Sequence, residues 1–192
     1  MSAYDVVLYV HIAVLLSAFA LGGVLHGSEW LMVRSATVGE LRVTARPQRL
    51  GPLFAPVILA LMGSGFWLLH LSRGADGFRF RDPFVWTAAI VLAVLFLDGP
   101  LVLGRHETVL RRQLAGAPDG PVTAELRATA TNRTAWTVSY ANTFTVLGVV
   151  LNMTTKPRLL WCVVDILAGA ALGALVARAA LSRAEKALAA SA

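Results

Sequence analysis

The sequence predicts an all-α integral membrane protein, a helical bundle with five transmembrane helices. Of its 192 residues, 57% are hydrophobic and only 15% are charged, and the mean hydropathy is +0.67. Five apolar runs are each about 20 residues long, which is enough for a helix to cross a hydrocarbon core of ~30 Å. A soluble globule of this length needs more polar surface, and a disordered chain needs more charge and fewer apolar residues. Both of those classes are therefore excluded.

The apolar runs follow one another closely and predict one transmembrane domain over residues 1–192, with spans at about 6–27, 52–71, 84–104, 136–153 and 159–177. The first run resembles a signal peptide, because Ala18-Phe19-Ala20 matches the Ala-x-Ala pattern of a cleavage site. Met1–Asp5, however, contains no Lys or Arg and carries the acidic Asp5, so we expect a retained transmembrane helix.

The basic residues predict the orientation of the bundle. The net charge is +6, but Lys and Arg lie between the apolar runs and form no single patch, so we expect no nucleic-acid partner. Most of them fall in the connections 28–50 and 105–133 and in the C-terminal tail. The positive-inside rule then places the C-terminus in the cytoplasm and the N-terminus outside. We expect a multi-pass protein of the bacterial plasma membrane.

Several local signals predict how the spans begin and end. The first helix is expected to continue beyond the bilayer through Trp30–Val33. The segment Arg81–Pro83 is expected to start the third span, and a helix that opens at Pro121 is expected to run into the fourth. The positions near the ends of the runs predict an aromatic belt of Trp67, Trp86, Trp136 and Trp161.

The four histidines are the strongest functional signal, because an imidazole in or near hydrocarbon needs a polar partner, a metal or a haem iron. By depth they form two pairs. His11 and His70 lie near the outer face, and His26 and His106 lie near the cytoplasmic face. Two antiparallel helices with histidines at equal depth could ligate a planar macrocycle, as b-type cytochromes do. The alternative is that each histidine is an interfacial residue that reaches a headgroup or a carbonyl.

Asp98 is an acid inside the third apolar run. It precedes Gly99 and Pro100, and because proline has no amide proton the helix is expected to be distorted beside this carboxylate. The structural interpretation is that Asp98 forms an ion pair with Arg105, seven residues further along. The functional interpretations are a proton relay, or a carboxylate that orients a ligating histidine. The single cysteine, Cys162, is expected to be a small buried apolar residue.

Gly169 and Gly173 form a Gly-x-x-x-Gly motif in the last span. This spacing marks a close contact between helices. It predicts either a contact within the chain or a homo-oligomer or larger membrane complex.

Three short motifs carry a family resemblance. They are Tyr9-Val10-His11-Ile12 with Gly22-Gly23 further along the same helix, Gly65-Phe66-Trp67-Leu68, and Asn152-Met153-Thr154-Thr155-Lys156-Pro157. The chain resembles a group of uncharacterised bacterial integral membrane proteins that is similar to the copper-resistance protein D and HemJ-type protoporphyrinogen oxidase families. The resemblance implies haem binding at His11. It does not extend to the tryptophan and the proline–arginine pair of the HemJ-like pattern, since Ala18 stands near the tryptophan position.

These observations leave three functions open. The first is binding of b-type haem or a metal by His11 and His70, with His26 and His106 as a second pair, for electron transfer or porphyrin-linked redox chemistry. The second is transport of copper or another small solute, in which the histidines, Met153, Cys162 and Asp98 contribute transient ligands. The third is a non-catalytic accessory subunit of a larger complex.

Overall fold

The computed structural model describes residues 1–72 and 77–191, with the side chains of 187–191 excepted. Within these ranges the chain is helical and contains no β-strand. The helices in chain order are α1 (Ala3–Arg34), α2 (Val38–Thr44), the 3₁₀ segment η1 (Arg46–Leu53), α3 (Phe54–Leu71), α4 (Pro83–Asp98), the π segment η2 (Gly99–Leu103), α5 (Gly104–Gly116), α6 (Ala124–Ala130), α7 (Arg133–Thr155) and α8 (Leu159–Ser191).

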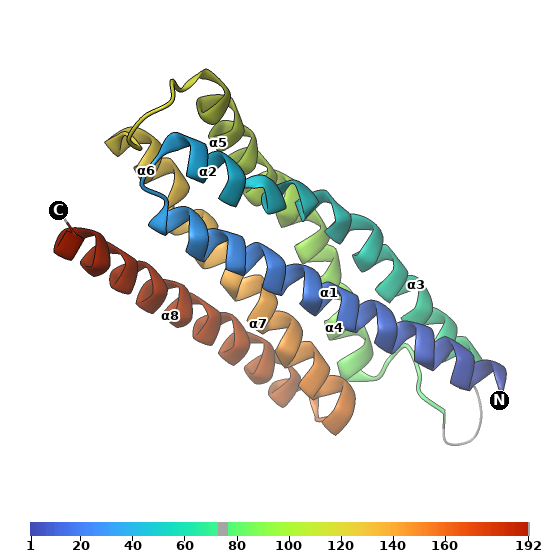
Figure 1. Cartoon of the computed structure of the whole chain (residues 1–192). Helices are drawn as coiled ribbons and strands as arrows, with labels where there is room; N and C mark the ends of the chain where they lie inside the picture. Colours follow the sequence, from blue (N-terminus) through green and yellow to red (C-terminus); the bar gives the residue numbers. More distant parts are fainter. Residues whose placement is uncertain (73–76, 192) are drawn as a thin grey trace.

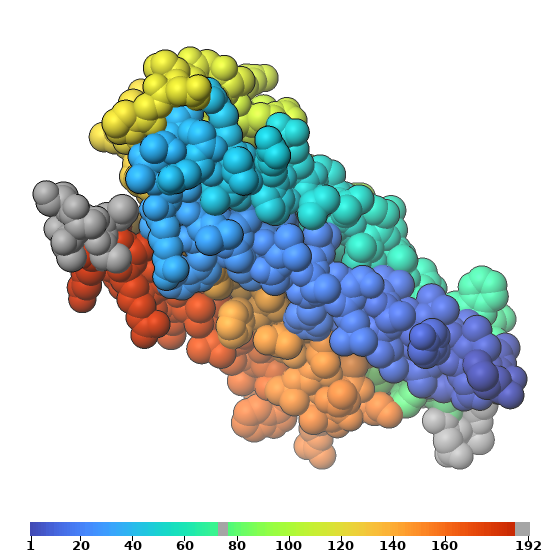
Figure 2. All heavy atoms as spheres, in the orientation of Figure 1, coloured from blue at the N-terminus to red at the C-terminus, as the bar shows by residue number. Residues whose placement is uncertain are grey.

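The long helices lie side by side in an elongated bundle (Figure 1). The short helices α2, α5 and α6 gather around the C-terminal part of α1 at one end, which we call the cap end. The N-terminus lies at the opposite end of the bundle and the C-terminus lies at the cap end. The space-filling view has the same elongated outline, broadened where the short helices pack (Figure 2).

Four helical stretches are long and apolar enough to cross a membrane: Ala3–Arg34, Val38–Leu71, Pro83–Gly116 and Leu159–Lys186. They contain four of the five predicted spans. Many large apolar side chains on these stretches are exposed, including Leu160, Leu167 and Leu175 at 69%, 62% and 61%. Such a surface suits hydrocarbon and does not suit water. The protein is therefore an α-helical membrane protein, and the remaining predicted span, 136–153, lies within the unbroken but more polar helix α7.

The predicted helix boundaries are confirmed in part. α1 continues to Arg34, beyond the predicted span, and α4 begins at Pro83 with Asp82 as its N-cap. The prediction of a continuous helix from Pro121 into the fourth span is wrong. Pro121 instead bridges Thr37, and α6 ends at Ala130. The helix is interrupted there because the Asn132 side chain accepts a hydrogen bond from the Ala135 amide and so starts a new helix, α7.

The cap end is held to α1 by an apolar cluster and by two hydrogen bonds of the partly buried Arg127. The cluster packs the end of α1 against α2, α5 and α6 and consists of Met32, Val38, Leu41, Leu110, Leu114, Leu126 and Ala130. Arg127 of α6 donates to the carbonyls of Val33 and Ser35, at 2.6 and 2.7 Å. These carbonyls lie at the C-terminus of α1, where the last carbonyl groups of a helix have no donor within the helix. The negative end of the helix dipole also favours a cation there. Burial lowers the pKa of Arg127 below its ordinary value.

α7 and α8 form the closest helix pair, and their contact depends on glycine. A Cβ on Gly169 would lie beside the Phe144 carbonyl oxygen, and a Cβ on Gly173 would lie 2.5 Å from the Tyr140 carbonyl oxygen. Gly148 of α7 approaches the backbone of Asp165 in the same way. The motif thus serves a contact within the chain, so self-association or a larger complex would have to use another surface.

Two further residues are buried near this helix pair. Cys162 is fully buried, as predicted, and the Asn152 amide donates to its carbonyl at 3.0 Å. Trp136 was expected in the aromatic belt, but it is only 1% exposed and its indole N–H donates to the Ala130 carbonyl. That expectation is wrong because the cap end covers the start of α7. Trp67, Trp86 and Trp161 are exposed, as a belt requires.

The glycine contact generates a stability prediction. We expect Gly169→Ala to lower the free energy of unfolding by about 1–3 kcal/mol, because the added methyl group forces the α7 and α8 backbones apart. Gly23→Ala is the matched control, since nothing lies within 4 Å of its Cβ position and alanine favours the helix. Thermal unfolding in mild detergent measures both. Equal unfolding temperatures for the two variants would contradict the close contact.

Candidate functional site

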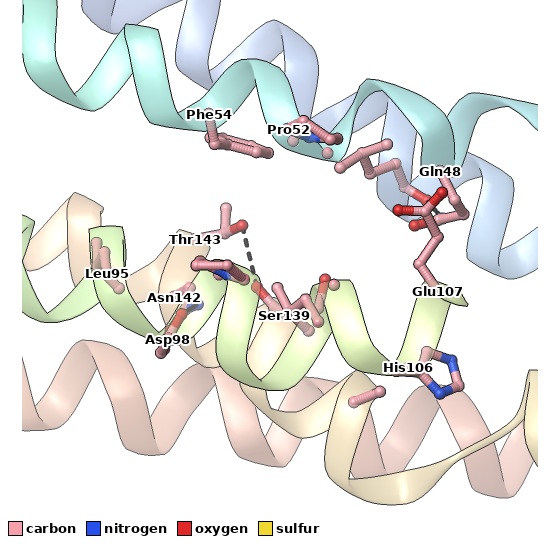
Figure 3. Close-up of a pocket in the computed structure, with 18 of the residues that line it drawn as sticks. Gln48, Pro52, Phe54, Leu95, Asp98, His106, Glu107, Ser139, Asn142 and Thr143 are labelled. Carbon is pink, nitrogen blue, oxygen red and sulfur yellow. Dashed lines mark hydrogen bonds between the residues drawn. The ribbon is translucent and has the colours of Figure 1, made fainter. Parts of the chain in front are cut away.

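A cavity of about 850 Å³ lies inside the bundle, towards the cap end. Residues of α1, η1 and α3 form one side, and residues of α4, η2, α5 and α7 form the other. Figure 3 shows Pro52 and Phe54 facing Leu95 and Asn142 across this space. The volume falls in the range of ordinary small-molecule sites.

The cavity lies where two of the membrane-length stretches leave α geometry. η1 introduces α3, and its residues Gln48, Arg49, Gly51 and Pro52 line the cavity. η2 separates α4 from α5, and the amide of Gly104 donates to the carbonyl of Gly99, five residues back. The predicted distortion at Asp98–Pro100 is thus confirmed and takes the form of a π segment. Non-α backbone at membrane depth is tolerated where it lines a cavity, and π segments are frequent at functional sites.

His26 is the centre of a hydrogen-bond network on the cavity wall. Its Nδ1 lies 3.0 Å from Oε2 of Glu29, one turn along α1, and its Nε2 lies 2.9 Å from the Thr143 hydroxyl of α7. The ring packs on Tyr140, with 4.1 Å between ring centroids. Glu29 is buried at 7% exposure. Such a carboxylate–histidine pair fixes the tautomer, with the proton on Nδ1 and a lone pair on Nε2.

This network is complete in either protonation state of His26. In the neutral ring, Nδ1–H donates to Glu29 and Nε2 accepts from the Thr143 hydroxyl. In the charged ring, Nε2–H donates to the Thr143 oxygen, and the Thr143 hydroxyl donates to the Ser139 carbonyl, 3.3 Å away (dashed line in Figure 3). The Thr143 hydroxyl can therefore act as donor or as acceptor towards Nε2 without moving the backbone.

Asp98 lines the same cavity and is paired with a neutral donor. Its Oδ1 accepts a hydrogen bond of 2.9 Å from the Asn142 amide of α7. The predicted partner, Arg105, is exposed, and the structure shows no ion pair between the two. That prediction is wrong because the wide turn of η2 lies between the two residues and changes their relative orientation around the helix. Asp98 keeps one carboxylate oxygen without a protein partner among the described residues.

The cap end of the cavity is more polar. Gln48 and Arg49 reach it from η1, and His106, Glu107 and Arg111 reach it from α5. Gln48 donates to the Leu25 carbonyl at 3.0 Å, which ties η1 to α1. In Figure 3 the side chain of Glu107 extends from α5 towards Gln48. Polar groups from two separate segments therefore border this end.

The structure places only one of the two predicted histidine pairs at the cavity. The Nδ1 of His11 lies 2.8 Å from the Ser64 hydroxyl, and its ring packs against Gly65 of α3. His70 is exposed six residues beyond Ser64, which is about 9 Å along the helix axis. Neither residue lines the cavity, whereas His26 and His106 both do.

Glu29, Asn142 and Thr143 of this site were not predicted from the sequence, whereas His26, His106 and Asp98 were. His26 and Glu29 are three residues apart on one helix, which places them on the same face and was a readable signal. Thr143 is 117 residues from His26, and Asn142 is 44 residues from Asp98, so only the tertiary structure brings them to this wall. Among the described residues, no group of three or more His, Cys, Asp or Glu side chains is arranged to hold a metal ion.

Comparison of the chain with protein-family models, curated protein sequences and solved structures gives no match.

The Asp98–Asn142 pair generates a prediction on stability. We expect Asn142→Leu to lower the free energy of unfolding by about 1–3 kcal/mol, because it leaves a half-buried carboxyl group without its donor. In the double variant Asp98→Leu/Asn142→Leu we expect much of this loss to be recovered. Chemical unfolding of the four proteins in mild detergent measures the coupling energy. Additive effects of the two substitutions would contradict the pairing.

Proposed function

We propose that the protein is an integral membrane protein of five spans that binds one amphiphilic small molecule in the cavity between α1, α3, α4 and α7. The observation that carries this proposal is the cavity of about 850 Å³ with the Glu29–His26–Thr143 network on its wall. Ionisable groups at membrane depth are costly and mark functional sites. Apolar side chains line most of the cavity, while its polar groups are few and localised, as in sites for amphiphilic ligands.

The first specific ligand that we propose is b-type haem. At His11, to which the family resemblance assigns haem, the ring packs against Ser64 and Gly65 of α3, and the residue does not line the cavity. At His26, Glu29 holds Nδ1, and ligation at Nε2 would replace only the hydrogen bond to Thr143. His106 lines the same cavity and is the second candidate ligand. Haem held there would supply one-electron transfer.

We expect the purified protein to bind about one haem per chain and to show a Soret band and a sharp α-band after reduction. His26→Ala should abolish both bands, because it removes the Nε2 lone pair at the cavity wall. Thr143→Val should keep them, since it removes only a competing hydroxyl group. Absorption spectra and a pyridine haemochrome assay measure these outcomes.

Two outcomes would contradict haem ligation at His26. If the bands survive in His26→Ala and disappear in His11→Ala, haem is bound at the α1–α3 contact and not at His26. A featureless spectrum after expression with added haem would exclude haem binding, and the cavity would then be a site for another solute. Asp98 on the cavity wall and the two non-α segments favour transport in that case, because such segments form substrate sites in transporters.

We also propose five crossings, with the N-terminus outside and the C-terminus in the cytoplasm. α7 is 23 residues long, which is sufficient to span the hydrocarbon core, and it packs along the full apolar part of α8. The termini lie at opposite ends of the bundle (Figure 1), as an odd number of crossings requires. The polar residues of α7 face the cavity and α8, which allows a less apolar helix to lie within the bundle.

Labelling of single cysteines tests this topology. In a Cys162→Ala background, we expect Ser2→Cys to react with a membrane-impermeant maleimide in intact cells, because the N-terminus is outside. Ser182→Cys, exposed near the C-terminal end of α8, should react only after the cells are lysed. Reaction of both positions on the same side would show an even number of crossings and contradict the proposal.

A further inference from the structure

Two arginines at the cap end of the cavity have no partner among the described residues. Arg49 of η1 and Arg111 of α5 both line the cavity and are exposed. Neither makes a hydrogen bond or an ion pair within the part of the chain that the structure describes. Arg42, Arg127 and Arg133 differ, since each donates to a carbonyl or a carboxylate. Two arginines that make no hydrogen bond or ion pair within the described residues therefore border this end of the cavity.

The acidic residues nearby do not neutralise both arginines. Glu107 is four residues before Arg111 on α5, a spacing that allows an ion pair, but no such pair forms. Its side chain extends towards Gln48 instead (Figure 3). Glu29 is engaged by His26, and Asp98 is engaged by Asn142. Arg49, Arg111 and Glu107 therefore leave an excess of positive charge at this end of the cavity.

Away from the two arginines, the cavity surface between α3 and α4 is apolar, and the hydrogen-bonded groups around His26 and Asp98 lie beside it. Phe54 and Ile58 of α3 and Leu95 of α4 line this surface. Leu95 lies across the space from Phe54 (Figure 3). A charged molecule without an apolar part would leave this region unfilled. A fully apolar molecule would leave the two guanidinium groups without an acceptor. The two halves of the cavity together specify a ligand with an anionic head and an apolar body.

We infer that the cavity binds an anionic amphiphile, with its carboxylate or phosphate between Arg49 and Arg111 and its apolar body between α3 and α4. This inference rests on the proposed function for the existence of a ligand in the cavity, and it adds the class of that ligand. The guanidinium fork suits both oxyanions. The ligand can come from two sources, a free carboxylic acid of the cytoplasm or an anionic lipid of the membrane.

Native mass spectrometry of the full-length chain in a neutral maltoside detergent tests the inference by counting bound molecules. The probes are two matched pairs: palmitic acid with hexadecanol, and phosphatidylglycerol with phosphatidylcholine. We expect the anionic member of at least one pair to bind about tenfold more tightly than its neutral partner. Preference within the first pair identifies a free acid as the source, and preference within the second identifies a membrane lipid.

Four variants locate the bound molecule. Arg49→Gln and Arg111→Gln should each weaken binding of the anionic probe, and together they should reduce it to the level of the neutral probe. Arg112→Gln is the matched control, because Arg112 is an exposed neighbour that does not line the cavity, and it should have no effect. Ala55→Phe places a larger side chain inside the cavity and should weaken binding of both members of a pair.

The outcomes separate this inference from the proposed function. An anionic preference that persists in the double variant, or that is lost equally in Arg112→Gln, would overturn the inference. Equal binding of anionic and neutral probes, reduced by Ala55→Phe, would overturn it as well but would support a ligand site in the cavity. Absence of binding by all four probes would overturn the inference and count against an amphiphile site as a whole.

Discussion

The structure depends on the requirement that every backbone polar group in hydrocarbon finds a partner within the protein. Most of the chain meets it with long α-helices. At η2 the missing amide proton of Pro100 makes an unbroken α-helix impossible. The backbone forms a wider turn there, in which the Gly104 amide donates a hydrogen bond to the Gly99 carbonyl. This adjustment, together with η1 at the start of α3, determines where the helices separate and where the cavity forms.

The polar groups of the cavity wall come from helices that are distant in sequence. α7 contributes the donor for Asp98 and the hydroxyl group for His26, so the same helix holds two ionisable groups of different helices in place. α7 in turn is fixed by its close glycine-dependent contact with α8. The position of the network on the cavity wall is therefore set by a contact on the opposite side of α7. None of the α8 residues whose side chains the structure describes lines the cavity. α8 instead packs against α7, which does line it.

The sequence predicted those features that depend on local chemistry. The long α1, the helix start at Pro83, the distortion after Asp98, the buried Cys162 and the close contact at Gly169 all follow from properties of single residues or short motifs. The pairings between helices could not be predicted. Equal depth in the membrane suggested His11 with His70, but the register of α1 against α3 places Ser64 at His11, and that register depends on the folded connection between the two helices. The break between α6 and α7 was readable, because Asn132 is a favourable N-cap residue.

The length of α1 has a consequence for the environment inside the cavity. A helix of 32 residues measures about 48 Å, whereas the hydrocarbon core is ~30 Å thick. In the proposed topology the polar cap end of α1 is the part that extends into the headgroup and water region, and the cavity then crosses the boundary between the two solvents. Its effective dielectric constant falls from the arginine end towards Phe54 and Leu95. A charge that enters would meet a rising desolvation cost with each step inward, so the gradient itself orients a molecule with one charged end before any specific contact forms.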